Sequence, residues 1–107
     1  MKQTDLINLI IQADEPALFF TSLEAASRYL EWQDVQDGVY PVAFGPHGEK
    51  YIVWNDKNVV LFSSTDSLDE PALEQTLRAF LAAVGVDADR ADSVRSLLVK
   101  CNPYISA

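Results

Sequence analysis

The middle of the chain alternates between short apolar runs and turn-forming clusters. Three runs are rich in β-branched and aromatic residues, which favour strands: Val39–Phe44, Tyr51–Trp54 and Val59–Phe62. The clusters between them, Gly45–Gly48 and Asn55–Asn58, have the composition of turns. This pattern predicts a three-stranded antiparallel meander over residues 39–62.

The N-terminal segment predicts a helix followed by a strand. Residues 4–13 place leucine and isoleucine at helical spacing after a candidate cap at Thr4. The β-branched pair Ile10–Ile11 leaves a strand as the alternative. Pro16 then interrupts the pattern, and Ala17–Phe20 is a short apolar run typical of a buried strand.

The next segment predicts a second helix and an edge strand. Thr21 lies three residues before Glu24, which is the spacing of a capping box, and the helix that it starts is expected to end near Leu30. Glu31–Val35 alternates polar and apolar residues, so we expect a short extended segment at a sheet edge. Asp37–Gly38 predicts the turn that leads into the meander.

The C-terminal part predicts a helical hairpin. Residues 64–74 are polar and acidic, and Pro71 suits the first turn of a helix whose apolar stripe ends at Gly85. Asp87 is the expected cap of a second helix, which Asn102–Pro103 stops. Two such helices, joined by a short connection, can cover one face of a sheet.

Together these elements predict a single α+β domain over residues 1–107. We expect an antiparallel sheet of four or five strands, with the C-terminal helical hairpin packed on one face and shorter N-terminal helices at its edge. A chain of this length, with 49% hydrophobic residues, fits one domain and has enough apolar material for a core. The lone Cys101 cannot form an internal disulfide, which favours a reducing compartment such as the cytoplasm. The N-terminal residues predict neither a signal peptide nor a membrane span.

The charge is strongly acidic, with 16 Asp and Glu residues against 8 Lys and Arg residues and a formal net charge of −8. Nucleic acid is disfavoured as a partner because phosphate binding needs a cluster of basic residues. A protein with a basic surface is favoured instead. General solubility is an equally good explanation of the charge.

Candidate catalytic residues are few, and we expect neither an enzyme nor a cofactor. The single histidine, His47, falls in a predicted turn, and Cys101 falls in a predicted helix, so a nucleophile paired with a base is not expected. One cysteine and one histidine cannot supply the ligands of a structural zinc site. The four glycines form no phosphate-binding loop.

The segment Phe19–Trp54 combines several scaffold features in a fixed order. These are a hydrophobic strand before Ser22, a helix start at Leu23–Ala26, a helix exit at Tyr29–Glu31, and the spacing from Asp34–Val35 to Gly38, Tyr40 and Gly48. In these features it resembles the small bacterial immunity proteins that are encoded beside polymorphic or type VI secretion toxins. The resemblance implies a cytoplasmic protein that binds one cognate toxin and blocks its active site without catalysis.

Exposed carboxylates beside aromatic residues are the candidate contacts for such a partner. Toxins that act on nucleic acids have cationic substrate sites, and an acidic inhibitor associates with them rapidly through electrostatic steering. The candidates are Glu31, Trp32, Asp34 and Asp37 in the expected edge segment, with Asp56 at the second hairpin turn. For each carboxylate the alternative is an ordinary solvated side chain, and for Trp32 it is a place in the core.

Two other functions remain open from the sequence. A ligand-sensing or regulatory domain would use a pocket lined by four aromatic residues: Tyr40, Phe44, Tyr51 and Trp54. A homodimeric structural protein would use the apolar second face of the sheet as its interface, so both a monomer and a homodimer are compatible with the sequence.

Overall fold

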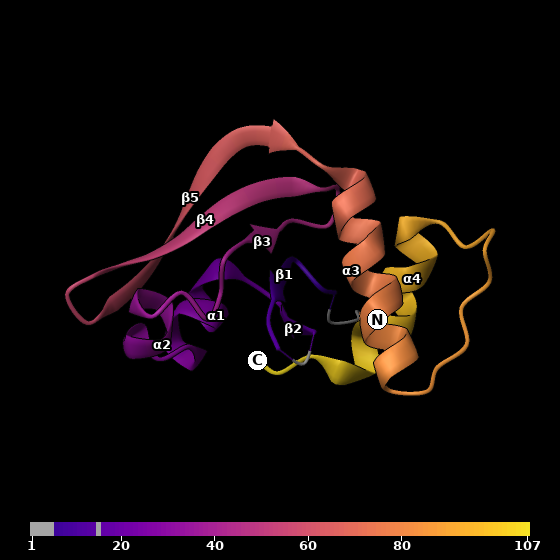
Figure 1. The fold of residues 1–107 in the computed structure, drawn as a ribbon, viewed down its shortest axis with the longest axis horizontal. Coiled ribbons are helices and arrows are strands. Elements are labelled where there is room, and N and C mark those ends of the chain that lie inside the picture. Colours follow the sequence, from indigo (N-terminus) through magenta and orange to yellow (C-terminus); the bar gives the residue numbers. More distant parts are fainter. Residues whose placement is uncertain (1–5, 15) are drawn as a thin grey trace, which may run out of the picture.

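The computed structural model describes residues 6–14 and 16–107. They form an α+β fold built on one five-stranded antiparallel sheet with the strand order β2-β1-β3-β4-β5 (Figure 1). The strands are β1 (Leu9–Gln12), β2 (Ala17–Phe20), β3 (Ala43–Phe44), β4 (Glu49–Asp56) and β5 (Val59–Leu68). The helices are α1 (Leu23–Tyr29), α2 (Trp32–Gln36), α3 (Glu70–Ala83) and α4 (Val94–Cys101), followed by the short 3-10 helix Asn102–Tyr104. The predicted fold class and the C-terminal helices are confirmed.

The expected N-terminal helix is wrong, because the segment is strand β1. It pairs with β2 on one side and with β3 on the other. Leu9, Ile10 and Ile11 are fully buried. A strand covered on both faces is apolar at every position, and its short apolar run cannot be distinguished from a helix by periodicity alone. Thr4, the expected cap, lies outside the described residues.

The strand β2 was predicted correctly, and the end of the chain covers its outer edge. The Ser106 amide donates to the Phe19 carbonyl at 2.9 Å, and the Thr21 amide donates to the Ala107 carbonyl at 2.9 Å. Residue Ile105 forms a parallel bridge with Phe19. The other edge of the sheet is the long strand β5.

The two short helices differ in how well the sequence predicts them. Helix α1 is where it was expected, but its cap is Ser22, whose hydroxyl accepts from the Ala25 amide at 3.0 Å, and not Thr21. The expected edge strand at 31–35 is wrong, because this segment is helix α2. Trp32 and Val35 lie three residues apart, which puts them on one face of a helix but on opposite faces of a strand. Both pack in the same cluster, as the helix requires.

The meander has both predicted turns, but its strands differ in length from the prediction. Strand β3 contains only Ala43–Phe44, and Pro41, which lacks an amide hydrogen, lies before it. Strand β5 continues to Leu68, beyond the predicted end of the third strand at Phe62. A bulge interrupts the pairing of β4 with β5 there, and Asp66 has a positive φ of 57°.

The C-terminal hairpin begins as predicted, with Pro71 in the first turn of α3 after the cap Asp69. The expected start of the last helix at Asp87 is wrong, because α4 begins at Val94 and Ser93 caps it. Residues 86–93 form a loop that Arg78 holds from the side. Its guanidinium donates to three backbone carbonyls of this loop, those of Asp89, Arg90 and Asp92, at 3.0 to 3.3 Å.

Alternation along β1 divides the core into two clusters, one on each face of the sheet. Ile10 faces α3 and α4, where it packs in a cluster that includes Phe19, Phe44, Leu73, Leu77, Leu81 and Leu97. Leu9 and Ile11 face α1 and α2, where they pack in a cluster that includes Phe20, Ala26, Leu30, Val35, Val53 and Val60. The N-terminal helices therefore cover the second face and do not lie only at the edge. These helices occupy the apolar second face that a homodimer was expected to use as its interface.

Candidate partner-binding surface

Helix α2 and the tip of the β4–β5 ribbon bring the predicted contact residues to one end of the molecule. The side chain of Asn55, near the end of β4, donates from Nδ2 to Gln36 Oε1 of α2 at 3.4 Å. Glu31 and Asp37 cap the two ends of α2 and are exposed, as is Asp56 at the end of β4. Figure 1 shows α2 beneath this ribbon, beside α1. We call Glu31, Asp34, Asp37 and Asp56 the acidic end.

Asp34 and Trp32 are less available than the other predicted residues. Asp34 is half-buried in the first turn of α2, where its negative charge suits the positive end of the helix dipole. Trp32 is also half-buried and packs against the cluster beneath α1 and α2. The packing therefore supports the alternative that the sequence left open for Trp32, a place in the core.

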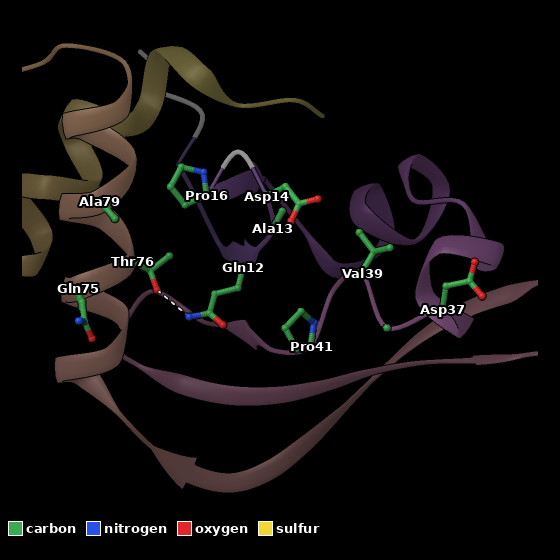
Figure 2. Close-up of a pocket in the computed structure, with 11 residues that line it drawn as sticks. Gln12, Ala13, Asp14, Pro16, Asp37, Val39, Pro41, Gln75, Thr76 and Ala79 are labelled. Atoms are coloured by element: carbon green, nitrogen blue, oxygen red, sulfur yellow. Dashed lines mark hydrogen bonds between the residues drawn. The ribbon is translucent and has the colours of Figure 1, made fainter.

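A groove of about 590 Å³ opens beside α3, and Asp37 lies at its rim (Figure 2). One wall consists of Gln75, Thr76 and Ala79 from α3, and the other of residues 37–39 and Pro41. In its floor, Gln12 of β1 donates from Nε2 to the Thr76 hydroxyl at 3.2 Å. That hydroxyl donates in turn to the Ala72 carbonyl at 3.0 Å.

The lining of this groove is half apolar, and its charged groups are acidic. Asp14 and Asp37 supply carboxylates, and Gln75 supplies a side-chain amide. These groups can accept hydrogen bonds from a lysine or arginine side chain. Sequence analysis predicted Asp37 but missed Asp14, Gln12 and Gln75. Gln12 and Asp14 lie at and just after the end of β1, and the placement of α3 across the sheet brings Gln75 to the same groove.

A second cavity of about 660 Å³ lies between α3, α4 and the segment before β1. Its lining is mainly apolar and includes the exposed side chains of Leu6 and Val99. The pocket expected from the sequence is not this one. Phe44 belongs to the cluster beneath α3 and α4, whereas Tyr40 and Tyr51 pack on the opposite face of the sheet. The sheet therefore separates the aromatic residues that were expected to line one pocket.

The candidate catalytic residues have ordinary structural surroundings. Cys101 is buried in the core, and this burial raises the pKa of its thiol to about 12, so the thiol is protonated at neutral pH. The side chain of His47 is 84% exposed, and its Nδ1 lies 3.6 Å from Glu49 Oε2. Across residues 6–14 and 16–107, no group of three or more His, Cys, Asp or Glu side chains is arranged to hold a metal ion.

Glu49 stabilises the turn between β3 and β4. Its Oε1 accepts from the His47 amide at 2.8 Å. Burial raises the pKa of the Glu49 carboxyl, but hydrogen bonds from the backbone amides of Glu49 and His47, together with the charge of His47, outweigh it. The pKa is therefore held below its usual value. The contacts between Glu49 and His47 therefore give both side chains a structural role in this turn.

In the described part of the chain, none of the helices combines the length and the apolar character that a membrane span requires. Comparison with protein-family models, with curated proteins and with solved structures found no match to this chain.

Proposed function

We propose that this chain is a non-catalytic, cytoplasmic protein-binding domain that binds a basic partner and blocks it, as an immunity protein blocks its toxin. The observation that carries the proposal is the acidic end, where α2 and the tip of β4 place carboxylates from two distant parts of the sequence on one region. A cation also lies beside this region, because Lys57, in the turn after β4, directly follows Asp56.

Electrostatics explains how such a region would act. Carboxylates gathered on one surface raise the local concentration of a positively charged partner and accelerate its association. Asp37 also lines the groove beside α3, where an inserted arginine or lysine of the partner would meet Asp14 as a second carboxylate. The toxin-inhibitor function rests on the resemblance of Phe19–Trp54 to immunity proteins.

Charge reversal at the acidic end tests the proposal. The double variant Asp34→Lys, Asp37→Lys should keep its fold but bind the basic partner at least tenfold more weakly, measured by titration calorimetry. The probe is the purified product of each open reading frame that flanks the gene. A matched control, Glu24→Lys with Asp87→Lys, changes the net charge equally at exposed positions outside the acidic end. Equal affinities of the two double variants would contradict the proposal.

The apolar cavity between α3 and α4 favours one alternative, a domain that senses a small molecule. Such a domain should be stabilised by a ligand in a thermal-shift screen, because a ligand that binds only the folded state raises the melting temperature. The melting temperature of an immunity protein should rise when its protein partner is added and should not change with the small molecules of the screen.

A further inference from the structure

The charged groups that line the groove beside α3 are all acidic. They are Asp14, just after β1, and Asp37, at the end of α2. Among the described residues that line the groove, none is a lysine, an arginine or a histidine. The ion pairs of residues 6–14 and 16–107 use other carboxylates, those of Glu24, Glu49, Glu74 and Asp92. Both carboxylates of the groove are therefore available to a cation from outside.

A hydrogen-bond network in the floor supplies a third acceptor. Thr76 is 5% exposed, and its hydroxyl donates its one hydrogen to the Ala72 carbonyl at 3.0 Å. The hydroxyl can then only accept from Gln12, so the amide nitrogen of Gln12 faces Thr76 at 3.2 Å. Figure 2 shows the amide oxygen of Gln12 turned away from Thr76, on the side of Pro41. Within the described residues no donor bonds to this oxygen, which leaves it as an acceptor in the groove.

The apolar half of the lining suits a long aliphatic side chain. It includes Ala79 of α3 together with Pro16, Val39 and Pro41. An arginine side chain combines an aliphatic stem with a planar guanidinium, whose five N–H donors can satisfy several oxygens at once. A guanidinium is also more weakly hydrated than the ammonium of lysine, so it loses less on entering a half-apolar groove. The volume of about 590 Å³ lies within the roughly 300–1,000 Å³ of typical ligand pockets, which leaves room for the neighbouring backbone.

We propose that the groove beside α3 binds an arginine side chain of the basic partner. The inference rests on the proposed function, and it names the side chain that the partner inserts and the groups that hold it: the carboxylates of Asp14 and Asp37 and the amide oxygen of Gln12. A second copy of the chain would bring another net charge of −8, so a basic protein is the occupant that the charges favour. The acidic end shares Asp37 with the groove and would attract the same partner.

A free arginine derivative tests the groove directly. The probe is N-acetyl-arginine methylamide, added at millimolar concentration to the isotope-labelled protein while its amide resonances are followed by NMR. We expect saturable shifts at groove residues such as Gln12, Asp14 and Gln75. The citrulline analogue is the matched control, because it keeps the shape of arginine but carries a neutral urea group. Absence of shifts, or equal shifts with the citrulline or the lysine analogue, would overturn the inference.

Two variants test whether the partner uses the groove, with the flanking gene product that the wild type binds as the probe. Asp14→Asn removes a carboxylate outside the acidic end, and Ala79→Phe fills the groove without a change of charge. Each should weaken binding by roughly tenfold or more in titration calorimetry. The matched controls are Asp87→Asn and Ala91→Phe, at exposed positions of the loop at residues 86–93, which does not line the groove. They should change the affinity less than about threefold, and thermal melts confirm that all variants are folded.

The outcomes separate this inference from the proposed function. If the wild type binds its basic partner and the two groove variants bind as tightly as their controls, the inference is wrong and the proposed function stands. If the arginine probe binds in the groove but no flanking product binds the wild type, the arginine site stands and the proposed function is wrong. If neither the arginine probe nor any flanking product binds, both are wrong.

Discussion

At the scale of single residues, Arg78 contributes most clearly to the fold because it connects two elements. Its guanidinium donates to the carbonyls of Asp89, Arg90 and Asp92 and pairs through Nε with Glu74 Oε2 at 2.9 Å. A planar group with several donors can satisfy several carbonyls at once, and lysine cannot reproduce this geometry.

We predict that Arg78→Ala lowers the free energy of unfolding by roughly 2–3 kcal/mol, because it removes charge-assisted hydrogen bonds and leaves loop carbonyls without partners. Arg28→Ala is the matched control, since Arg28 forms an exposed ion pair with Glu24 on α1. Its loss should cost less than about 1 kcal/mol. Urea denaturation measures the free energy of unfolding of both variants. Equal losses would contradict the claim that Arg78 stabilises the loop at residues 86–93.

Asp92 makes stability depend on pH. A hydrogen bond from Lys100 Nζ at 2.8 Å, followed by one from the Asp89 amide, holds the pKa of Asp92 below its usual value of 3.8. A carboxyl whose pKa is lower in the folded state stabilises the fold above its unfolded pKa. That contribution is lost as the pH falls through the folded pKa.

We therefore predict that Asp92→Asn reduces stability at pH 7 and weakens its dependence on pH below about pH 4. Melting curves recorded from pH 7 to pH 2 measure this difference. Asp87→Asn is the control, because the structure shows Lys100 bound to the Asp87 backbone carbonyl and not to its carboxylate. Parallel melting profiles for wild type and Asp92→Asn would contradict the role of the Lys100 pair.

At the scale of elements, Gly48 joins the β3–β4 turn to the start of α3. Its carbonyl accepts from the Asp69 amide at 2.8 Å, and its φ is +91°. A Cβ added there would lie 2.8 Å from the Glu70 backbone nitrogen, so the backbone of α3 would have to move.

We predict that Gly48→Ala destabilises the protein by more than Gly38→Ala, by at least about 1 kcal/mol. Both residues have a positive φ, and at Gly38, whose φ is +78°, an added Cβ meets no atom within 4 Å. The penalty at Gly38 is therefore limited to the backbone strain of roughly 1–2 kcal/mol. Chemical denaturation compares the two, and an equal loss of stability would show that the junction with α3 is not tightly packed.

The sequence predicts elements well where a local signal determines them and poorly where tertiary contacts do. Turn residues located both hairpin turns, and Pro71 located the start of α3. Strand β1 was taken for a helix because burial on both faces removes its alternation. Helix α2 was taken for a strand because five residues are too few to show a period, although the spacing of Trp32 and Val35 fits a helix and not a strand.

In the candidate site, too, local signals identify some residues and tertiary packing alone brings in others. The carboxylates Asp37 and Asp56 could be selected from the sequence because they fall in predicted turns, where exposure is expected, and both are exposed. The groove beside α3 could not be predicted, since only the packing of α3 across the sheet brings Gln75 to the same groove as Gln12 and Asp14. The exposure of Ile52 and Trp54 could not be predicted either, because the sequence does not show where the cover provided by α3 and α4 ends.

At the scale of the whole molecule, the sheet determines which surfaces are free. Its β2 edge is covered by residues 105–107, and both faces near β1 are covered by helices. Strands β4 and β5 are 8 and 10 residues long, whereas β1 and β2 have 4 residues each, so the ribbon extends beyond the covered part. The acidic end lies at the tip of this extension, where a partner can reach it.

The measurement that tests the central claim most directly is capture of the flanking gene products by the purified protein at low and at raised salt, with the retained proteins identified by mass spectrometry. We predict one stoichiometric basic partner with a toxin domain. Its affinity should fall several-fold when the salt concentration rises from about 0.05 M to 0.5 M, because salt screens the steering charges. Retention of no partner at either salt concentration, by a folded monomer, would contradict the account.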